Sequence, residues 1–221
     1  MFECTLREKK HARTKIAIMT AFINALEKTK FDDISIRQIC KEVEISEGTF
    51  FNYFSEKIDI IHYYSQLFFI KIIWRAKESV PQEKFPDFIN AVFQNMAEEL
   101  GNVNVAYQML SLLIVQKEKP KKMVITDIER HIVFPDCAGI ENIPVVLIDE
   151  YLKSWLKDAH NKGLIPSSID IDDLLVSLIT ILTGTILALK YENLKGKSYH
   201  YLRQLNILWK SLGIKYNERI R

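Results

Sequence analysis

The stretch that decides the fold is "ISIRQICKEVEISEGTFFNYF", residues 34–54, because it begins two helices within a short span. Ser35 is followed by Gln38 at the spacing of a capping box, which predicts the first helix start. Ser46 begins the second helix and precedes an acidic residue, which suits the positive end of the helix dipole. About three residues, 43–45, remain for the turn, so the two helices must cross at a steep angle, as in a helix-turn-helix.

Apolar residues fall on one face of each of these helices, and the second helix is left with a polar outer face. The apolar positions are Ile36, Ile39, Cys40 and Val43 in the first helix and Phe50 and Phe54 in the second. A helix of seven or eight residues is about 11 Å long and is unstable alone, so packing must hold it. Such a rod fits the major groove, about 12 Å wide, where Thr49 can contact a thymine methyl or a base edge and Asn52 can pair with adenine. The alternative is an ordinary helical hairpin inside an all-α core.

A longer pattern surrounds the two helices. Its members are Phe31, Ile34, Ser35, Ile36, Arg37, Ile39, Cys40, Val43, Ile45, Ser46, Gly48, Thr49, Phe50, Phe51, Tyr53, Phe54 and Lys57. On these positions, residues 12–61 resemble the DNA-binding domain of the tetracycline-repressor (TetR) family of transcriptional regulators. The resemblance implies an all-α protein with a three-helix DNA-binding domain at residues 1–57 and a larger helical ligand-binding and dimerisation domain at residues 58–221.

The resemblance also implies roles for single residues. It places Arg37 on DNA from the first helix of the motif and Lys57 on a phosphate. The contact surface of the recognition helix is implied to consist of Glu47, Gly48, Thr49, Phe51, Asn52 and Tyr53.

Three positions depart from the family pattern. The family usually has Gly where this chain has Glu44, so either a residue with a side chain adopts a left-handed backbone or the turn is built differently. The family usually has Tyr where this chain has Phe51, and Tyr53 is the candidate for supplying the missing hydroxyl. Cys40 stands where Ala is common; we interpret it as a small buried residue, and a redox sensor is the alternative.

Length and composition agree with two helical domains. The 221 residues allow a small domain and a second of about 160 residues. Seven Gly and six Pro are few for a β-rich fold of this size. The net charge of +2 favours no partner by itself. A basic cluster at the first helix could touch phosphates or the minor groove, or could be only a solvated helix start; its members are Arg7, Lys9, Lys10, Arg13 and Lys15.

The sequence favours a cytoplasmic protein without a membrane span. Cys4, Cys40 and Cys137 are widely spaced and odd in number, which indicates reduced thiols. The N-terminus lacks the apolar region of a secretory signal. Residues 174–189 carry no charge, but this stretch is shorter than the roughly 20 residues of a span and contains Ser and Thr, so we expect a buried helix.

Helical spacing continues through the rest of the chain. We expect helices at residues 10–28, 56–78, 86–101, 103–117, 119–134, 145–161, 171–192 and 198–212, in addition to the two of the helix-turn-helix. The loop between the helices at 119–134 and 145–161 contains two Pro and a Gly.

The helices at 145–161 and 171–192 are expected to form a homodimer. The resemblance implies a four-helix bundle made of two helices from each subunit. The helix at 171–192 is apolar nearly all round, and Gly184 would let helices approach closely. The alternative is that the last helix covers this surface. A dimer would read a palindromic DNA operator.

A small-molecule effector is the second expected partner, and no cofactor or metal is expected. The candidate walls of its pocket are aromatic and apolar, which indicates a hydrophobic or amphipathic effector; they are Phe69, Ile73, Phe93, Met96, Tyr107, Leu110, Tyr151 and Trp155. Such residues can equally be plain core. A ligand that prefers one tilt of the helix at 56–78 would change DNA affinity, and in a repressor it would release DNA.

Two other classes of function compete with regulation. An enzyme is not expected, because the five His are scattered and no metal, phosphate-loop or nucleophile motif is present. Asp127 and His131 share a helical face and could pair a carboxylate with an imidazole. A helical adaptor that binds protein only would leave the polar face of the recognition helix unused.

Overall fold

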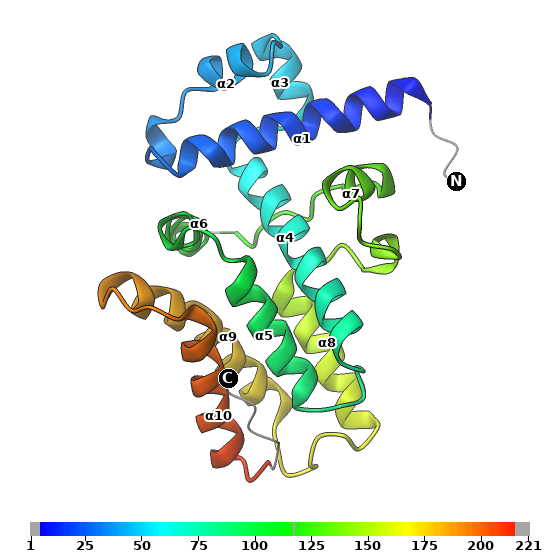
Figure 1. Cartoon of the computed structure of the whole chain (residues 1–221), viewed down its shortest axis with the longest axis vertical. Helices are drawn as coiled ribbons and strands as arrows, with labels where there is room; N and C mark the ends of the chain where they lie inside the picture. Colours follow the sequence, from blue (N-terminus) through cyan, green and yellow to red (C-terminus); the bar gives the residue numbers. More distant parts are fainter. Residues whose placement is uncertain (1–4, 117, 215–221) are drawn as a thin grey trace. The chain divides into compact units, whose positions relative to one another are not determined.

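The computed structural model describes residues 5–116 and 118–214, and these residues form helices and connections with no strand among them. Figure 1 shows the helices in chain order. The chain divides into two compact units, Met1–Lys71 with Gln108–Val145 and Ile72–Tyr107 with Val146–Arg221. The predicted all-α class is confirmed. The predicted domains, 1–57 and 58–221, remain a prediction about function.

The first unit begins with the three helices of the helix-turn-helix domain. They are α1 (Leu6–Leu26), α2 (Ile36–Glu42) and α3 (Glu47–Tyr53), with a short 3-10 helix, η1 (Phe31–Asp33), before α2. Helix α1 starts at a capping box between Thr5 and Glu8, four residues before the predicted start. Its core face includes Ala12, Ile18 and Phe22, all buried. This packing supplies the support that the short α2 and α3 require.

The first unit also contains α7 (Asp127–Val133) and the short helix η2 (Ile140–Asn142). The prediction of one helix at 119–134 is wrong at its start, because residues 118–126 are not helical. Thr126 caps α7 in a capping box with Glu129. Upstream of this cap, Gln66 donates to the carbonyl of Lys121 at 2.9 Å and accepts from the amide of Met123 at 3.0 Å. A side chain therefore satisfies backbone groups that a helix would have paired.

The second unit is built from α5 (Asp87–Glu99), α8 (Ile148–Asn161), α9 (Ile171–Tyr191) and α10 (Lys197–Ser211). Helix α10 packs against α5 and α9, and α8 packs against α9. The core between them holds Phe88, Phe93 and Trp209, which are fully buried. Helices α4 (Lys57–Ser79) and α6 (Val103–Val115) each contribute residues to both units.

Helix α9 is long and apolar enough to cross a membrane by length and composition, with 28% of its most apolar window buried. Leu174, Leu178 and Leu189 are buried, whereas Val176 is 63% exposed. The expectation of a buried helix therefore holds for one face only, because among the described residues α8 and α10 leave the other face of α9 uncovered.

Candidate nucleic-acid interface

The turn between α2 and α3 is closed by backbone hydrogen bonds. The amide of Ile45 donates to the carbonyl of Cys40 at 2.9 Å, and the amide of Glu44 donates to the carbonyl of Lys41 at 3.4 Å. This is the Schellman arrangement, which places the residue after the helix end in the left-handed region. Glu44 occupies that position with φ of 58°. Of the two alternatives considered for Glu44 in place of the usual Gly, the first is therefore confirmed. A residue with a side chain adopts the left-handed conformation that favours Gly.

Serine side chains begin both helices, as the sequence predicts. The Ser35 hydroxyl accepts from the amide of Gln38 at 3.4 Å, and the Ser46 hydroxyl accepts from the amide of Thr49 at 3.1 Å. At Ser35 the described cap consists of this bond, without the predicted return bond from the Gln38 side chain. The two hydroxyls of Ser46 and Thr49 also lie 2.8 Å apart, so the Thr49 hydroxyl already has a local partner.

Aromatic packing fixes the orientation of α3. Phe50 is fully buried and Phe54 is 1% exposed. The ring of Phe54 lies edge-on to Tyr63 of α4 with centroids 5.6 Å apart, and Tyr53 packs on His11 of α1 with centroids 4.5 Å apart. A helix of seven residues is thus held on two sides by neighbouring helices.

The opposite face of α3 is open to solvent within the described chain. Glu47, Gly48, Phe51 and Asn52 are exposed, and Thr49 and Tyr53 are half-buried. Arg37 is exposed on α2 and lines an open groove of about 680 Å³ between α2 and the start of α3. Seven of the eight predicted DNA-contact residues therefore lie on α2 or α3 with accessible surface. Their contacts with DNA stay a prediction.

Lys57, the eighth residue, is engaged within the chain. Its ammonium donates to the carbonyls of Phe31, Asp32 and Ile34 at 3.0, 3.1 and 3.0 Å. An ammonium has three N–H donors, so these bonds use all of them. Lys57 ties the start of α4 to the connection between α1 and α2, a role that its sequence position did not indicate. The predicted phosphate contact would have to replace one of these bonds.

Four of the five basic residues in the α1 cluster are exposed, and the fifth is buried. Arg7, Lys9, Lys10 and Arg13 are exposed. The expectation that Lys15 could touch DNA is wrong, because this side chain is 7% exposed and pairs with Glu129 at 3.0 Å. Lys15 lies on the face of α1 that packs against α7, three residues after buried Ala12.

The cysteines behave as structural residues where the structure describes them. Cys40 is buried. Burial raises the pKa of its thiol, and the nearby Glu47 carboxylate raises this pKa by a smaller amount. A raised pKa keeps the thiol protonated and unreactive, which favours the interpretation as a small core residue over a redox sensor. Cys137 is half-buried, and Cys4 lies outside the described residues.

The eight candidate effector contacts are distributed over both units. Phe69 and Leu110 belong to the first unit and the other six to the second. In the second unit, Phe93 packs on Tyr201, and the hydroxyl of Tyr107 lies 3.0 Å from that of Tyr191.

Trp155 lies against Phe88, with ring centroids 5.1 Å apart, and lines a cavity of about 100 Å³. The Tyr151 hydroxyl accepts from Gln82 at 3.0 Å. Ile73 and Met96 are buried. The ligand role of all eight residues stays a prediction.

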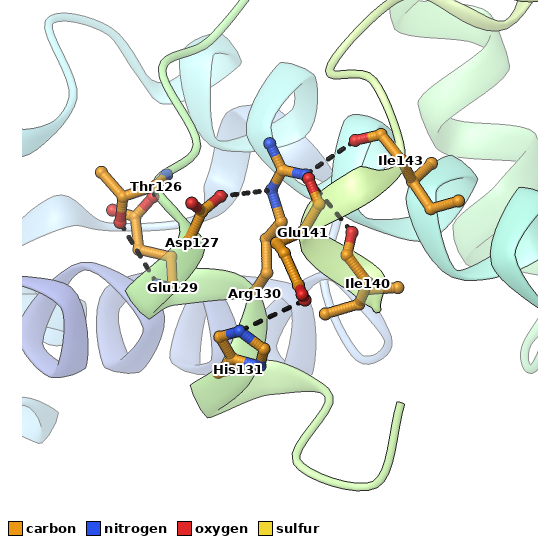
Figure 2. Close-up of polar contacts among 8 residues, drawn as sticks. All are labelled: Thr126, Asp127, Glu129, Arg130, His131, Ile140, Glu141 and Ile143. Atoms are coloured by element: carbon orange, nitrogen blue, oxygen red, sulfur yellow. Dashed lines mark hydrogen bonds and ion pairs between the residues drawn. The ribbon is translucent and has the colours of Figure 1, made fainter. Parts of the chain in front are cut away.

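The pairing of Asp127 with His131 considered for an enzyme does not form. Asp127 lies 3.8 Å from Arg130, and His131 lies 3.4 Å from Glu141, as Figure 2 shows. Arg130 is buried and donates to the carbonyls of Ile140, Glu141 and Ile143 at 3.3, 2.8 and 2.7 Å. Within residues 5–116 and 118–214, no three His, Cys, Asp or Glu side chains are grouped to hold a metal.

Comparison with known proteins identifies the fold. No family model matches the sequence, and no curated protein matches it. Among solved structures, the chain is similar to the crystal structure of Thermus thermophilus FadR, a TetR-family transcriptional repressor, in complex with lauroyl-CoA. The identity is 15%, the TM-score is 0.61, and the match covers 94% of this chain and 98% of that chain. The chain therefore has the fold of a TetR-family repressor, as the sequence pattern predicts.

Proposed function

We propose that this protein is a ligand-responsive transcriptional regulator that binds a palindromic DNA operator as a homodimer, acts as a repressor, and works in the cytoplasm. One observation carries the proposal. Helix α3 is held by buried Phe50 and Phe54 while Asn52 and its neighbours face solvent. A small rigid helix with an open polar face is the element that major-groove recognition requires.

The exposed residues divide into two groups by the contact they can make. Thr49 and Asn52 can meet base edges, because a methyl group fits thymine and an amide pairs with adenine. Arg37 on α2 and the exposed basic residues of α1 are suited to phosphates, which supply affinity without sequence information. Phe51, which is 48% exposed, has no hydroxyl, so its contact with DNA must be apolar.

Dimerisation is supported by the uncovered face of α9. Val176 on this face is 63% exposed, and α8 lies beside α9, joined to it by an ion pair of 2.9 Å between Lys153 and Asp172. A second copy packing on α8 and α9 would bury this apolar face. Two recognition helices related by a twofold axis would then read two half-sites.

The proposed effector is a hydrophobic or amphipathic small molecule. The solved structure of similar fold holds lauroyl-CoA, an apolar chain on a polar carrier, which favours the same chemical class here. Helix α4 has residues in both compact units. A ligand that binds one arrangement of α4 more tightly would shift DNA affinity by the same coupling free energy. In a repressor the liganded arrangement binds DNA more weakly.

Selection of bound sites from random double-stranded DNA tests the proposal. We expect a palindrome, and we expect Asn52→Ala to change the preferred base within each half-site. Asn24→Ala is the matched control, since Asn24 is exposed on α1 outside the recognition helix. Recovery of no common sequence at low salt would argue for a helical adaptor or an enzyme instead.

A further inference from the structure

A buried ion pair joins the helix-turn-helix domain to α7. Lys15 of α1 lies 3.0 Å from Glu129 of α7, and their side chains are 9% and 2% exposed. The Lys15 ammonium also donates to the carbonyl of Val124 at 2.7 Å and lies 4.2 Å from the centre of the Tyr63 ring. The second carboxylate oxygen of Glu129 accepts from the amide of Thr126 at 2.8 Å. Both charges are therefore solvated by the protein rather than by water.

Helix α7 is fixed on its other side by Arg130, the residue that follows Glu129. Figure 2 shows the Arg130 guanidinium against the 140–143 turn, where it donates to the carbonyls of Ile140, Glu141 and Ile143. A helix of seven residues has little stability of its own. Successive side chains of α7 thus bind α1 and the 140–143 turn, and α7 serves as a rigid connector between them.

Helix α6 makes a second connection to α1, at the C-terminal end of α1. The Gln108 amide donates to the carbonyl of Leu26 at 3.0 Å, and its oxygen accepts from the amide of Phe31 at 3.3 Å. Side chains or carbonyls of α6 and of the α7 region therefore contact α1 or its C-terminal connection. All of these groups belong to the first compact unit.

We propose that Lys15 and Glu129 are positioning residues that fix the orientation of the helix-turn-helix domain on α7. The body that carries the recognition helix then includes residues 108–145 and extends along α4 to Lys71, instead of ending at Lys57. A conformational signal that reaches the α6–α7 segment is transmitted to α1 without passing along α4. This inference goes beyond the proposed function, since it concerns the mechanical unit and holds for any partner of α3.

An ion pair and the apolar packing around it make different demands on geometry. Apolar side chains can slide past one another at small cost, whereas a buried lysine that leaves its carboxylate is left as an uncompensated charge. Replacing both Lys15 and Glu129 by apolar residues removes the cost of a buried unpaired charge, and it also removes the ion pair that constrains the orientation. The two contributions can therefore be separated by comparing single with double variants.

Distances between two spin labels in the full chain test whether Lys15 and Glu129 fix the orientation of the helix-turn-helix domain on α7. The labels are placed at Ala17→Cys on α1 and Asp136→Cys after α7, both exposed, in a chain with Cys4→Ser and Cys137→Ser. The parent should give one narrow distance distribution. Lys15→Met and Glu129→Leu should each lower Tm, and the double variant should recover most of the loss while its distribution widens about twofold.

The same two changes at exposed residues of α2, Lys41→Met with Glu42→Leu, are the matched control and should change neither Tm nor the distribution, because exposed charges contribute little. A double variant with the parent's narrow distribution would overturn the inference, since packing alone would then set the orientation. Single variants with the parent's Tm would overturn it as well. Failure of the protein to select DNA would refute the proposed function and leave the distance result unaffected.

Discussion

Replacement of Lys57 by Met separates a structural role from a DNA-contact role. Two of its three bonds to backbone carbonyls are partly buried, and the bond to the carbonyl of Asp32 is exposed. Water can replace the exposed bond at little cost, and each partly buried bond is worth about 1 kcal/mol. Lys57→Met should therefore lower the free energy of unfolding by about 2 kcal/mol.

Urea unfolding followed by circular dichroism measures this loss. In a chain of 221 residues, the same loss corresponds to a fall in Tm of about 4–8 °C. Lys41→Met is the control, because Lys41 is exposed on α2, and it should leave stability within about 0.5 kcal/mol of the parent. An unchanged urea midpoint for Lys57→Met, together with a DNA salt slope reduced by about one, would show that Lys57 binds phosphate and would refute the structural role.

Three further changes have defined outcomes. Glu44→Gly should stabilise the protein by about 1 kcal/mol in urea unfolding, because Gly adopts the left-handed conformation without strain, and a midpoint that falls would exclude strain at this turn. Thr49→Ala and Asn52→Ala should each cost about 1–3 kcal/mol on the matching base pair and less on altered sites, and equal losses on every sequence in a binding titration would rule out base reading. His62 is buried, and burial lowers its pKa below the usual 6.5, so its neutral form is favoured in the folded state. The associated stability is fully present above pH 6.5 and is lost as the pH falls below it; His62→Gln should flatten this dependence in urea unfolding between pH 7 and 5, whereas an unchanged slope would assign it to other groups.

The parts of the fold that could be predicted from the sequence are those set by local chemistry. Ser35 and Ser46 mark the two helix starts because an N-cap acts on amides of the following turn. The predicted bounds of α9 agree with the structure to within one residue, because its long apolar run follows the capping residue Asp170. The early start of α1 had a local signal too, in the Thr5 and Glu8 capping box, and the predicted start missed it.

The parts that could not be predicted depend on residues far apart in the chain. Lys15 looked like a member of a basic cluster, since its partner Glu129 is distant in sequence and carries no local mark. The carbonyl partners of Lys57 were equally hidden, because every residue offers a carbonyl. The non-helical segment before α7 exists because Gln66 binds its backbone, a tertiary contact that overrides helical spacing.

A fluorescence anisotropy titration of the selected palindrome at several salt concentrations tests the reading of DNA by α3 most directly. We expect affinity that falls steeply with salt, with a slope of about −0.9 per phosphate contact, and weaker binding to DNA with scrambled half-sites. Asn52→Ala should weaken the preference for the palindrome and keep the salt slope. Binding that is absent at low salt, insensitive to salt, or equal for both DNAs would contradict the account.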